Sequence, residues 1–170
     1  MGIHSGWRRC VQWTHIIGSD GSHHSVHGNS GRSLCWSLVL AGGVVILSIV
    51  PLGAARSQAD FTMADMGAPR AMFERLPAWG KRASWAHQNS FEAFSLHAPA
   101  ALIAVIAALQ TGALSGVAAT AALLQPVLRL IYIGAYVGNV PPLRGLCWAS
   151  ALLCTGVLYV ESLRALLQGG

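Results

Sequence analysis

The chain alternates long stretches without charged residues with short polar segments. Between Arg32 and Arg56 lie 23 uncharged residues, and a helix needs about 20 apolar residues to cross the hydrocarbon layer of a bilayer. Between Glu92 and Arg129 lie 36 uncharged residues, too many for one such helix and enough for two. The Gly- and Ser-containing run at 111–116 supplies the turn between these two helices, because these residues allow the backbone to reverse.

Two prolines and a last apolar stretch complete the pattern. Pro141 and Pro142 are expected to end the third helix, because proline cannot donate the hydrogen bond that would continue it. The sequence therefore predicts an all-α integral membrane four-helix bundle in one domain, residues 33–168. Its helices are expected at about 34–55, 83–110, 117–140 and 143–167.

The first 32 residues differ from the rest. They are polar, rich in Gly and Ser, and contain five of the seven histidines, so a flexible, disordered N-terminal tail is expected at 1–32. A start codon assigned too far upstream is an alternative. The first helix could also be a signal peptide cleaved near Gly53, Ala54 and Ala55, although the region before it is far longer than the usual charged segment.

Composition agrees with a membrane protein and excludes several other classes. Hydrophobic residues make up 54% of the chain and charged residues 10%, whereas soluble domains have about 25% charged residues. The net charge is +5, but the basic residues are scattered without the dense basic run of a nucleic-acid surface. Four cysteines lack any CxxC pair, and the histidines lack carboxylate or cysteine partners. Neither a disulfide framework nor a metal site is expected.

Basic residues predict the orientation in the membrane. Six lie in the polar segments 56–82 and 141–144, against four on the opposite side. Positive charge in short loops marks the cytoplasmic face. We therefore expect a multi-pass protein of the bacterial inner membrane or another cellular membrane, with loops 56–82 and 141–144 cytoplasmic.

The third helix contains polar residues where the bilayer disfavours them. Gln125, Arg129, Tyr132 and Tyr136 are three or four residues apart and share one helix face. An arginine in the middle of a span costs about 3 kcal/mol or more, and such residues usually face a bundle interior or a cavity. Arg129 is therefore a functional candidate. The alternative is that it only pairs with Glu92 to hold two helices together.

The second helix carries a complementary polar stripe. Arg82, Trp85, Asn89 and Glu92 are again three or four residues apart. At about 1.5 Å per residue from the 111–116 turn, Glu92 lies at the same depth as Tyr136, so the two stripes can meet.

The meeting point of the stripes would form a pocket rimmed by Arg82, Arg129 and Arg144. Such a pocket suits a small ligand with carboxylates and an amine, because arginine forks onto carboxylates and an acid such as Glu92 can take an ammonium. A nearby arginine also lowers the pKa of a thiol and favours the nucleophilic thiolate. The peptide thiol glutathione has all of these groups.

These residues belong to two recognisable runs. RASWAHQNSFEAF at 82–94 and LRLIYIGAYVGNVPPLR at 128–144 resemble the second- and third-helix signatures of the MAPEG family, the membrane-associated proteins in eicosanoid and glutathione metabolism. With the four spans and the basic loop, the resemblance covers about residues 34–167.

The resemblance implies a homotrimer that binds glutathione between neighbouring subunits. It assigns Arg144 to activation of the glutathione sulfur. It assigns binding of the tripeptide to Arg82, Asn89, Glu92, Arg129, Tyr132 and Tyr136. The implied function is a membrane-embedded glutathione-dependent transferase or peroxidase, which conjugates or reduces a hydrophobic small-molecule substrate that arrives from the membrane lipids.

Two other functions remain open. Family members that bind glutathione well commonly have a second basic residue three positions after Arg82, and this chain has Trp85 there. This favours a catalytically silent MAPEG-like membrane scaffold or lipid-binding protein, in which Arg129 and Glu92 act only as structural links. A small transporter is a weaker alternative, because neither an internal repeat nor a pair of interrupted helices is visible.

Overall fold

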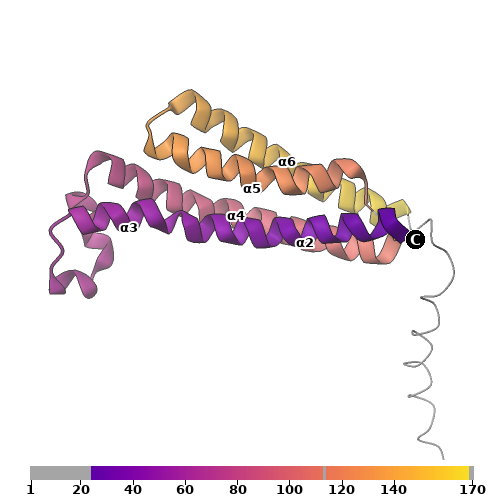
Figure 1. Ribbon diagram of the computed structural model, residues 1–170, viewed down its shortest axis with the longest axis horizontal. Helices are drawn as coiled ribbons and strands as arrows, with labels where there is room; N and C mark the ends of the chain where they lie inside the picture. The colour runs from indigo at the N-terminus through magenta and orange to yellow at the C-terminus, as the bar shows by residue number, and fades with distance from the viewer. Residues whose placement is uncertain (1–23, 113, 169–170) are drawn as a thin grey trace, which may run out of the picture.

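The computed structural model describes residues 24–112 and 114–168, with side chains from residue 31 onward. Long helices lie side by side along one axis, with α2 packed against α4 and α5, and α5 packed along α6 (Figure 1). The elements are α2 (His24–Leu47), α3 (Ile49–Gln58), η2 (Met63–Met66), η3 (Pro69–Arg75), α4 (Ala78–Thr111), α5 (Gly116–Val137) and α6 (Pro141–Gln168).

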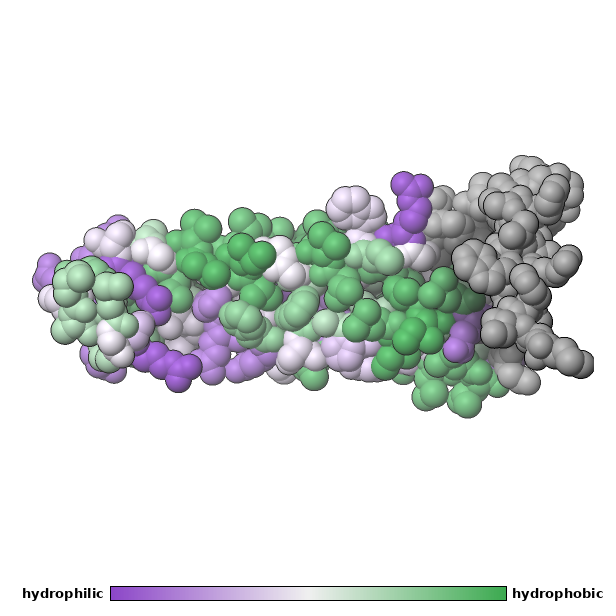
Figure 2. Space-filling model, turned by 90° about the horizontal axis from the view of Figure 1, so that it is seen from below, coloured by the Kyte–Doolittle hydropathy of each residue, from purple (hydrophilic) through white to green (hydrophobic). Residues whose placement is uncertain are grey.

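Four helical segments of the described chain are long and apolar enough to cross a membrane. They are Gly31–Gln58, Ala78–Thr111, Gly116–Val137 and Pro141–Gln168. On the face shown in Figure 2, hydrophobic residues cover much of the middle of the bundle, and many of the hydrophilic ones lie toward the end that carries η2 and η3. Large apolar side chains exposed on a bundle are expected where lipid replaces water. The all-α membrane bundle predicted from the sequence is thereby confirmed.

α2 and α4 extend beyond the uncharged stretches that predicted them. α2 begins at His24, so residues 24–32, which were expected to belong to the tail, are helical. α4 begins at Ala78, five residues before the predicted start. A lack of charge marks the part of a helix inside hydrocarbon, whereas the helix itself continues into the polar interface. Residues 1–23 of the predicted tail lie outside the described residues, and the division into tail and domain stays a prediction.

The turn between α5 and α6 corrects the expected role of the prolines. α5 ends at Val137, three residues before the predicted end. Asn139 adopts a left-handed backbone conformation with φ 58°, and the N–H of Val140 donates to the carbonyl of Ala135 at 2.9 Å, as in a Schellman motif. Pro141 is the first residue of α6. Proline is favoured at this position because the N–H groups of the first turn have no acceptor within the helix, so the missing N–H costs no hydrogen bond.

Buried alanines form much of the bundle core. Near the 111–116 turn they pack with Leu34, Leu114 and Leu158. In a bilayer, helices associate through close packing of small residues, since lipid tails are as apolar as leucine side chains. The alanines of this cluster are Ala100, Ala104, Ala107, Ala118 and Ala122. The core therefore holds the helices at close range without large interlocking side chains.

Gly80 marks a close approach between α3 and α4. A Cβ added there would lie 2.6 Å from the Cβ of Ala55, which is fully buried. We expect Gly80→Ala to lower the free energy of unfolding by about 1–3 kcal/mol, as overpacking typically does, and to lower the thermal unfolding midpoint in detergent. Gly53→Ala is the matched control, because its added Cβ meets nothing within 4 Å. Equal midpoints for the two variants would contradict this packing.

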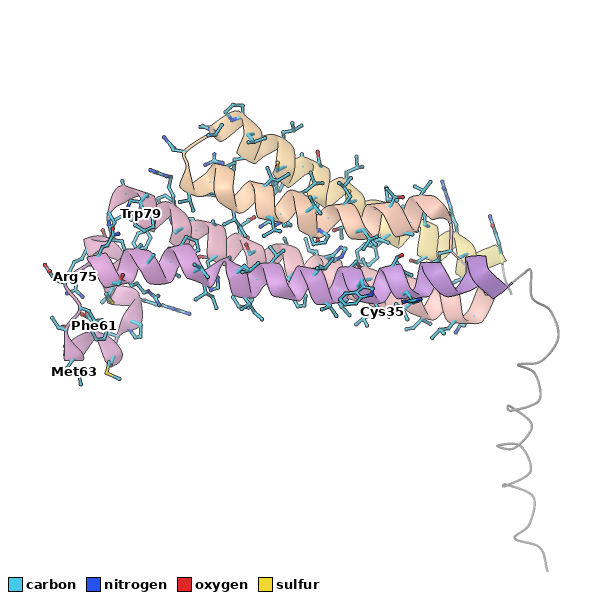
Figure 3. All side chains as sticks on the ribbon, in the orientation of Figure 1. Cys35, Phe61, Met63, Arg75 and Trp79 are labelled. Atoms are coloured by element: carbon cyan, nitrogen blue, oxygen red, sulfur yellow. The ribbon has the colours of Figure 1, made fainter. Side chains whose placement is uncertain are left out.

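The segment between α3 and α4 is organised by Asp65. Its carboxylate accepts hydrogen bonds from the backbone N–H of Thr62 at 2.8 Å and the Thr62 hydroxyl at 2.9 Å. Arg75 forms an ion pair with the same carboxylate and donates to the carbonyl of Asp60. Figure 3 labels Arg75 beside Phe61 and Met63 at this end of the bundle. One carboxylate thus ties the start of η2 to the end of η3.

Acid is expected to loosen this segment. The hydrogen bond from the Thr62 backbone, followed by the Thr62 hydroxyl and Arg75, holds the pKa of Asp65 below its usual value of 3.8. A lowered folded pKa stabilises the fold above the unfolded value, and this stabilisation is lost as the pH falls through the folded pKa. Hydrogen exchange of residues 60–76, corrected for intrinsic rates, should therefore accelerate below about pH 3.8. Asp65→Asn should remove that step, whereas Asp60→Asn should retain it.

Candidate functional site

The polar stripes of α4 and α5 meet inside the bundle. Arg129, on α5, is only 3% exposed, and its Nη2 donates to Asn89 Oδ1 of α4 at 3.0 Å. Asn89 Nδ2 in turn donates to Glu92 Oε2 at 3.0 Å. These contacts form a chain from a buried guanidinium through an amide to an exposed carboxylate.

Glu92 and Arg129 do not pair directly. Among the described residues, none of the ion pairs within 4.0 Å joins them, so the alternative in which Arg129 simply pairs with Glu92 does not describe this site. Asn89 lies between the two charges because the side chains at 89 and 92 share a helix face. Gln88 Nε2 donates to the other carboxylate oxygen at 3.3 Å. Glu92 therefore stays on the exposed side, where a ligand cation can reach it.

Two arginines bracket a pair of tyrosines. The Arg129 guanidinium lies 4.0 Å from the centre of the Tyr132 ring, and Arg144 lies 4.7 Å from the centre of the Tyr136 ring. The two rings meet edge to face, with centroids 5.4 Å apart. A desolvated cation–π contact contributes about 2 kcal/mol. The tyrosines thus position one guanidinium from α5 and one from the first turn of α6 on the same side of the bundle.

Arg82 borders this group. Its Nε donates to the carbonyl of Val137 at 3.1 Å, one of the last carbonyls of α5, which no later turn of that helix satisfies. This bond fixes the beginning of α4 against the end of α5. Arg82 therefore has a structural contact in addition to its position near the candidate site.

Two hollows flank the hydrogen-bonded series Arg129, Asn89 and Glu92. The first has a volume of about 400 Å³ and is lined by Trp85, Gln88, Asn89, Glu92, Tyr132 and Tyr136. The second has a volume of about 210 Å³ and includes Asn89, Glu92 and Arg129 in its lining. Five of the seven predicted site residues thus line one or both hollows. Arg82 and Arg144 line neither, and lie beside them through Val137 and Tyr136.

His97 was not foreseen from the sequence, whereas His87, which lies beside the polar stripe of α4, was expected to be an interface histidine rather than a ligand or base. His97 of α4 is fully buried, and its Nδ1 lies 3.4 Å from the hydroxyl of Thr155 on α6. His87 Nδ1 lies 2.6 Å from the hydroxyl of buried Ser48, where α2 meets α3. The available signal was a histidine deep within a predicted span, since intramembrane ionisable residues are functional candidates by default.

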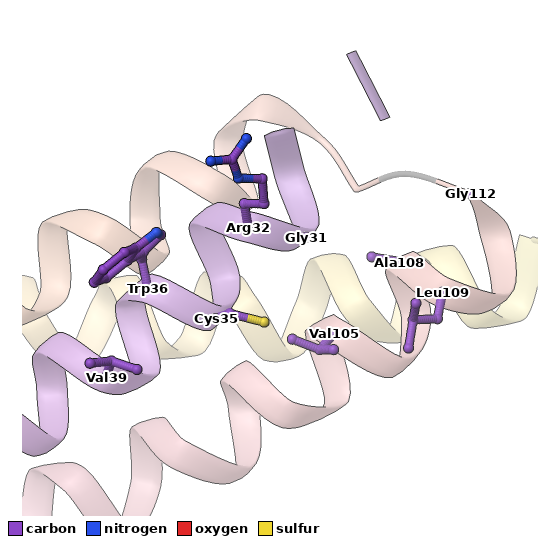
Figure 4. A pocket seen from close by; sticks show the side chains of 9 residues that line it. All are labelled: Gly31, Arg32, Cys35, Trp36, Val39, Val105, Ala108, Leu109 and Gly112. Carbon is purple, nitrogen blue, oxygen red and sulfur yellow. The ribbon is translucent and has the colours of Figure 1, made fainter. Parts of the chain in front are cut away.

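A larger cleft lies at the other end of the bundle. It has a volume of about 600 Å³ and lies between α2 and the end of α4. The Cys35 side chain of α2 points toward Val105 of α4 (Figure 4), and Trp36 and Leu109 also line the cleft. None of the candidate residues lines this cleft, and its lining is mainly apolar, with Arg32 as its charged residue.

Metal chemistry finds no support in the described part of the chain. Over residues 31–112 and 114–168, whose side chains the structure describes, no three His, Cys, Asp or Glu side chains come close enough to hold a metal ion. The histidines at 4, 15, 23, 24 and 27 lie outside this range.

Comparison with known proteins gives the family. The family model described as MAPEG family matches residues 33–164, a range that contains most of each of the four spans and every candidate residue. No curated protein matches the chain, and no solved structure does either. The match covers most of the chain and agrees with the four-span bundle, so this integral membrane protein belongs to the MAPEG family.

Proposed function

We propose that the protein is a membrane-embedded glutathione-dependent transferase or peroxidase that acts on hydrophobic substrates. The observation that carries this proposal is the chain from buried Arg129 through Asn89 to exposed Glu92 at the wall of an open cleft. Keeping a buried arginine in a membrane protein is costly. A ligand whose binding depends on both Arg129 and Glu92 would offset this cost.

The cleft supplies complementary groups for the tripeptide. Glu92 would take the ammonium of glutathione, and Arg82, which lies beside the cleft and keeps its two Nη groups free of the Val137 contact, would take a carboxylate. Tyr132 and Tyr136 would line the peptide, and Arg129 would hold Asn89 and Glu92 in place. Because the 400 Å³ cleft is open to the surroundings, we further propose that a neighbouring copy in a homotrimer closes it. The basic loops 56–82 and 141–144 would face the cytoplasm, where glutathione is available.

Arg144 would act on the sulfur. A guanidinium next to a thiol stabilises the thiolate. In conjugation, the sulfur forms a bond to an electrophilic carbon, and the leaving group departs with its electron pair. In peroxide reduction, the sulfur attacks the terminal peroxide oxygen, the O–O bond breaks and the alkoxide takes up a proton. A second glutathione thiol then displaces hydroxide from the sulfenic acid, giving the disulfide and water.

A second candidate is a silent membrane scaffold or lipid-binding protein. Trp85 is 47% exposed, lines the 400 Å³ cleft and packs on Phe73 with ring centroids 5.7 Å apart. An indole at this point adds apolar surface instead of a second cation for the carboxylates of glutathione. Trp85 therefore favours an apolar occupant of the cleft.

Glutathione binding separates the two candidates. The full chain is purified in detergent and titrated with glutathione at neutral pH, with heat and ultraviolet thiolate absorbance as readouts. S-methylglutathione is the matched ligand, because it keeps the charges but cannot form a thiolate. The enzyme should bind both and show thiolate absorbance only with glutathione. Absence of binding at millimolar glutathione would refute the transferase proposal and favour the scaffold or lipid-binding function.

A further inference from the structure

A pocket at the η2 and η3 end of the bundle carries two arginines without an acid partner among the described residues. It has a volume of about 390 Å³ and lies where α3, η3 and the beginning of α4 meet. Arg56 of α3 and Arg70 of η3 both line it, and we call it the two-arginine pocket. None of the seven predicted site residues lines this pocket, so it is distinct from the candidate site.

The neighbouring basic side chains already have partners. Arg75 pairs with Asp65, and Lys81 pairs with Glu74 at 3.0 Å. Among the described residues, none of the ion pairs within 4.0 Å involves an arginine of the pocket. Like charges that line one pocket repel each other, and a bound anion offsets this repulsion. The planar fork of arginine matches the oxygens of a phosphate or a carboxylate, so the pocket favours an anionic ligand.

The two-arginine pocket lies at the edge of the hydrocarbon layer. Arg56 is the first charged residue after 23 uncharged residues of the first span, so it lies close to where this span leaves the lipid tails. Trp85 also lines the pocket and packs on Phe73, with ring centroids 5.7 Å apart. Tryptophan is enriched at the headgroup level of membranes. The pocket thus combines cations with an aromatic wall at the depth of the lipid phosphates.

The adjoining segment η2 exposes apolar side chains at the same end of the bundle. Phe61, Met63 and Met66 are all exposed, and Figure 3 shows Phe61 and Met63 where the segment projects beyond the long helices. In Figure 1 this segment projects on the side of α3 away from α5 and α6. Exposed apolar patches mark contacts with partners or with membranes. Because this segment directly follows a membrane span, lipid is the nearest apolar partner.

We infer that the two-arginine pocket binds the headgroup phosphate of an anionic phospholipid. The phosphate oxygens accept hydrogen bonds from Arg56 and Arg70, and the glycerol and the start of an acyl chain lie along Trp85 and Phe73. A zwitterionic lipid carries its own cation on the headgroup, which offsets the attraction to the arginines. Basic pockets at the ends of membrane spans recognise anionic headgroups in this way. The inference does not rest on the proposed function, because it needs no glutathione.

Native mass spectrometry of the full chain in a neutral detergent tests this binding. The protein is titrated with dioleoylphosphatidylglycerol and, separately, with dioleoylphosphatidylcholine, which has the same acyl chains and phosphate but no net charge. The anionic lipid should bind about 30-fold more tightly, the ratio expected for two basic residues near the membrane surface. The double variant Arg56→Gln with Arg70→Gln should lose this preference. Equal affinities for the two lipids, or a double variant that keeps the full preference, would overturn the inference.

A matched pair of single variants separates the pocket from the net charge of the protein. Arg70 is exposed on η3, so Arg70→Gln should fold even if the double variant does not. It should lower the affinity for the anionic lipid about fivefold. Arg164→Gln removes the same charge from an exposed position of α6 and should bind the lipid like the parent protein. Equal losses in both single variants would mean that net charge alone attracts the lipid, and would overturn the pocket.

Two competitors identify the source of the anion. Millimolar inorganic phosphate should leave the lipid bound, because it lacks the acyl chains that lie along the aromatic wall. Displacement by phosphate would overturn the lipid assignment in favour of a soluble phosphorylated ligand. Glutathione should also leave the lipid bound, and displacement by glutathione would assign the arginines to its carboxylates instead. A protein that binds no glutathione but retains the lipid preference would refute the proposed transferase and support this site.

Discussion

Replacing Arg129 with alanine is expected to lower the affinity for glutathione by at least about 100-fold, since removing one partner of a buried charge network costs about 3–5 kcal/mol. The guanidinium donates to Asn89 and lies over the Tyr132 ring. Without it, Asn89 loses the contact that orients its amide toward Glu92, and the carboxylate loses its nearest compensating charge inside the bundle. Titration calorimetry in detergent measures the affinity, and far-ultraviolet circular dichroism checks that the helices remain.

Two further variants serve as controls for the Arg129→Ala experiment. Arg164→Ala removes an arginine whose side chain is 67% exposed and paired with Glu161, and it should bind glutathione like the parent protein. Arg129→Lys keeps the charge but lacks the planar donor fork, so an intermediate affinity is expected. A helical Arg129→Ala protein that binds glutathione normally would show that the buried guanidinium only supports the fold.

Arg144→Ala is expected to act on the reaction rather than on binding. The Arg144 side chain lies over the Tyr136 ring at the edge of the cleft, where we propose that it faces the sulfur of glutathione. Removing a charge that stabilises a reacting anion lowers kcat by about 10²–10³-fold. The pKa of bound glutathione should rise toward that of a free thiol, because the nearby cation is gone. A pH titration of thiolate absorbance in the bound state measures this rise.

The separation between kcat and affinity is the informative part of the Arg144 experiment. S-methylglutathione, which has no thiol to ionise, should bind to Arg144→Ala with an affinity within about tenfold of the parent value. Arg144→Lys should restore part of the thiolate absorbance, because the positive charge is restored. An equal loss of affinity for both ligands, with the thiolate still formed, would assign Arg144 to holding the peptide instead.

The spans and the meeting of the polar stripes were predictable from the sequence. Charge-free length identifies a span, and three- and four-residue spacing assigns Arg129 and Asn89 to the faces that meet. The indirect connection of Arg129 to Glu92 through Asn89 was not predictable. Residue spacing does not distinguish an arginine that pairs with Glu92 from one that donates a hydrogen bond to Asn89. The rotamers that decide this depend on packing among three helices. The signatures that indicated the family were therefore more informative about the fold than about the contacts.

The turn after α5 shows a second limit. Proline was interpreted as a stop signal, yet the same missing N–H makes it a good first residue of the next helix. The actual end of α5 depends on the left-handed backbone of Asn139, and asparagine in a short polar turn gives only a weak signal of that conformation. The buried pair His97 and Thr155 was equally hard to foresee, because the residues lie on helices that are not adjacent in sequence.

The alanine core has a consequence for how such a protein can change. At a buried alanine between closely packed helices, glycine or serine is tolerated, while a larger residue forces two backbones apart. Lipid-facing leucines, valines and isoleucines meet only acyl chains, so one can replace another at little cost. Substitutions should accordingly accumulate on the lipid-facing surface of the bundle and be rare at the buried alanines between the helices. Two such chains can keep the same architecture after most of their bulky residues have been exchanged.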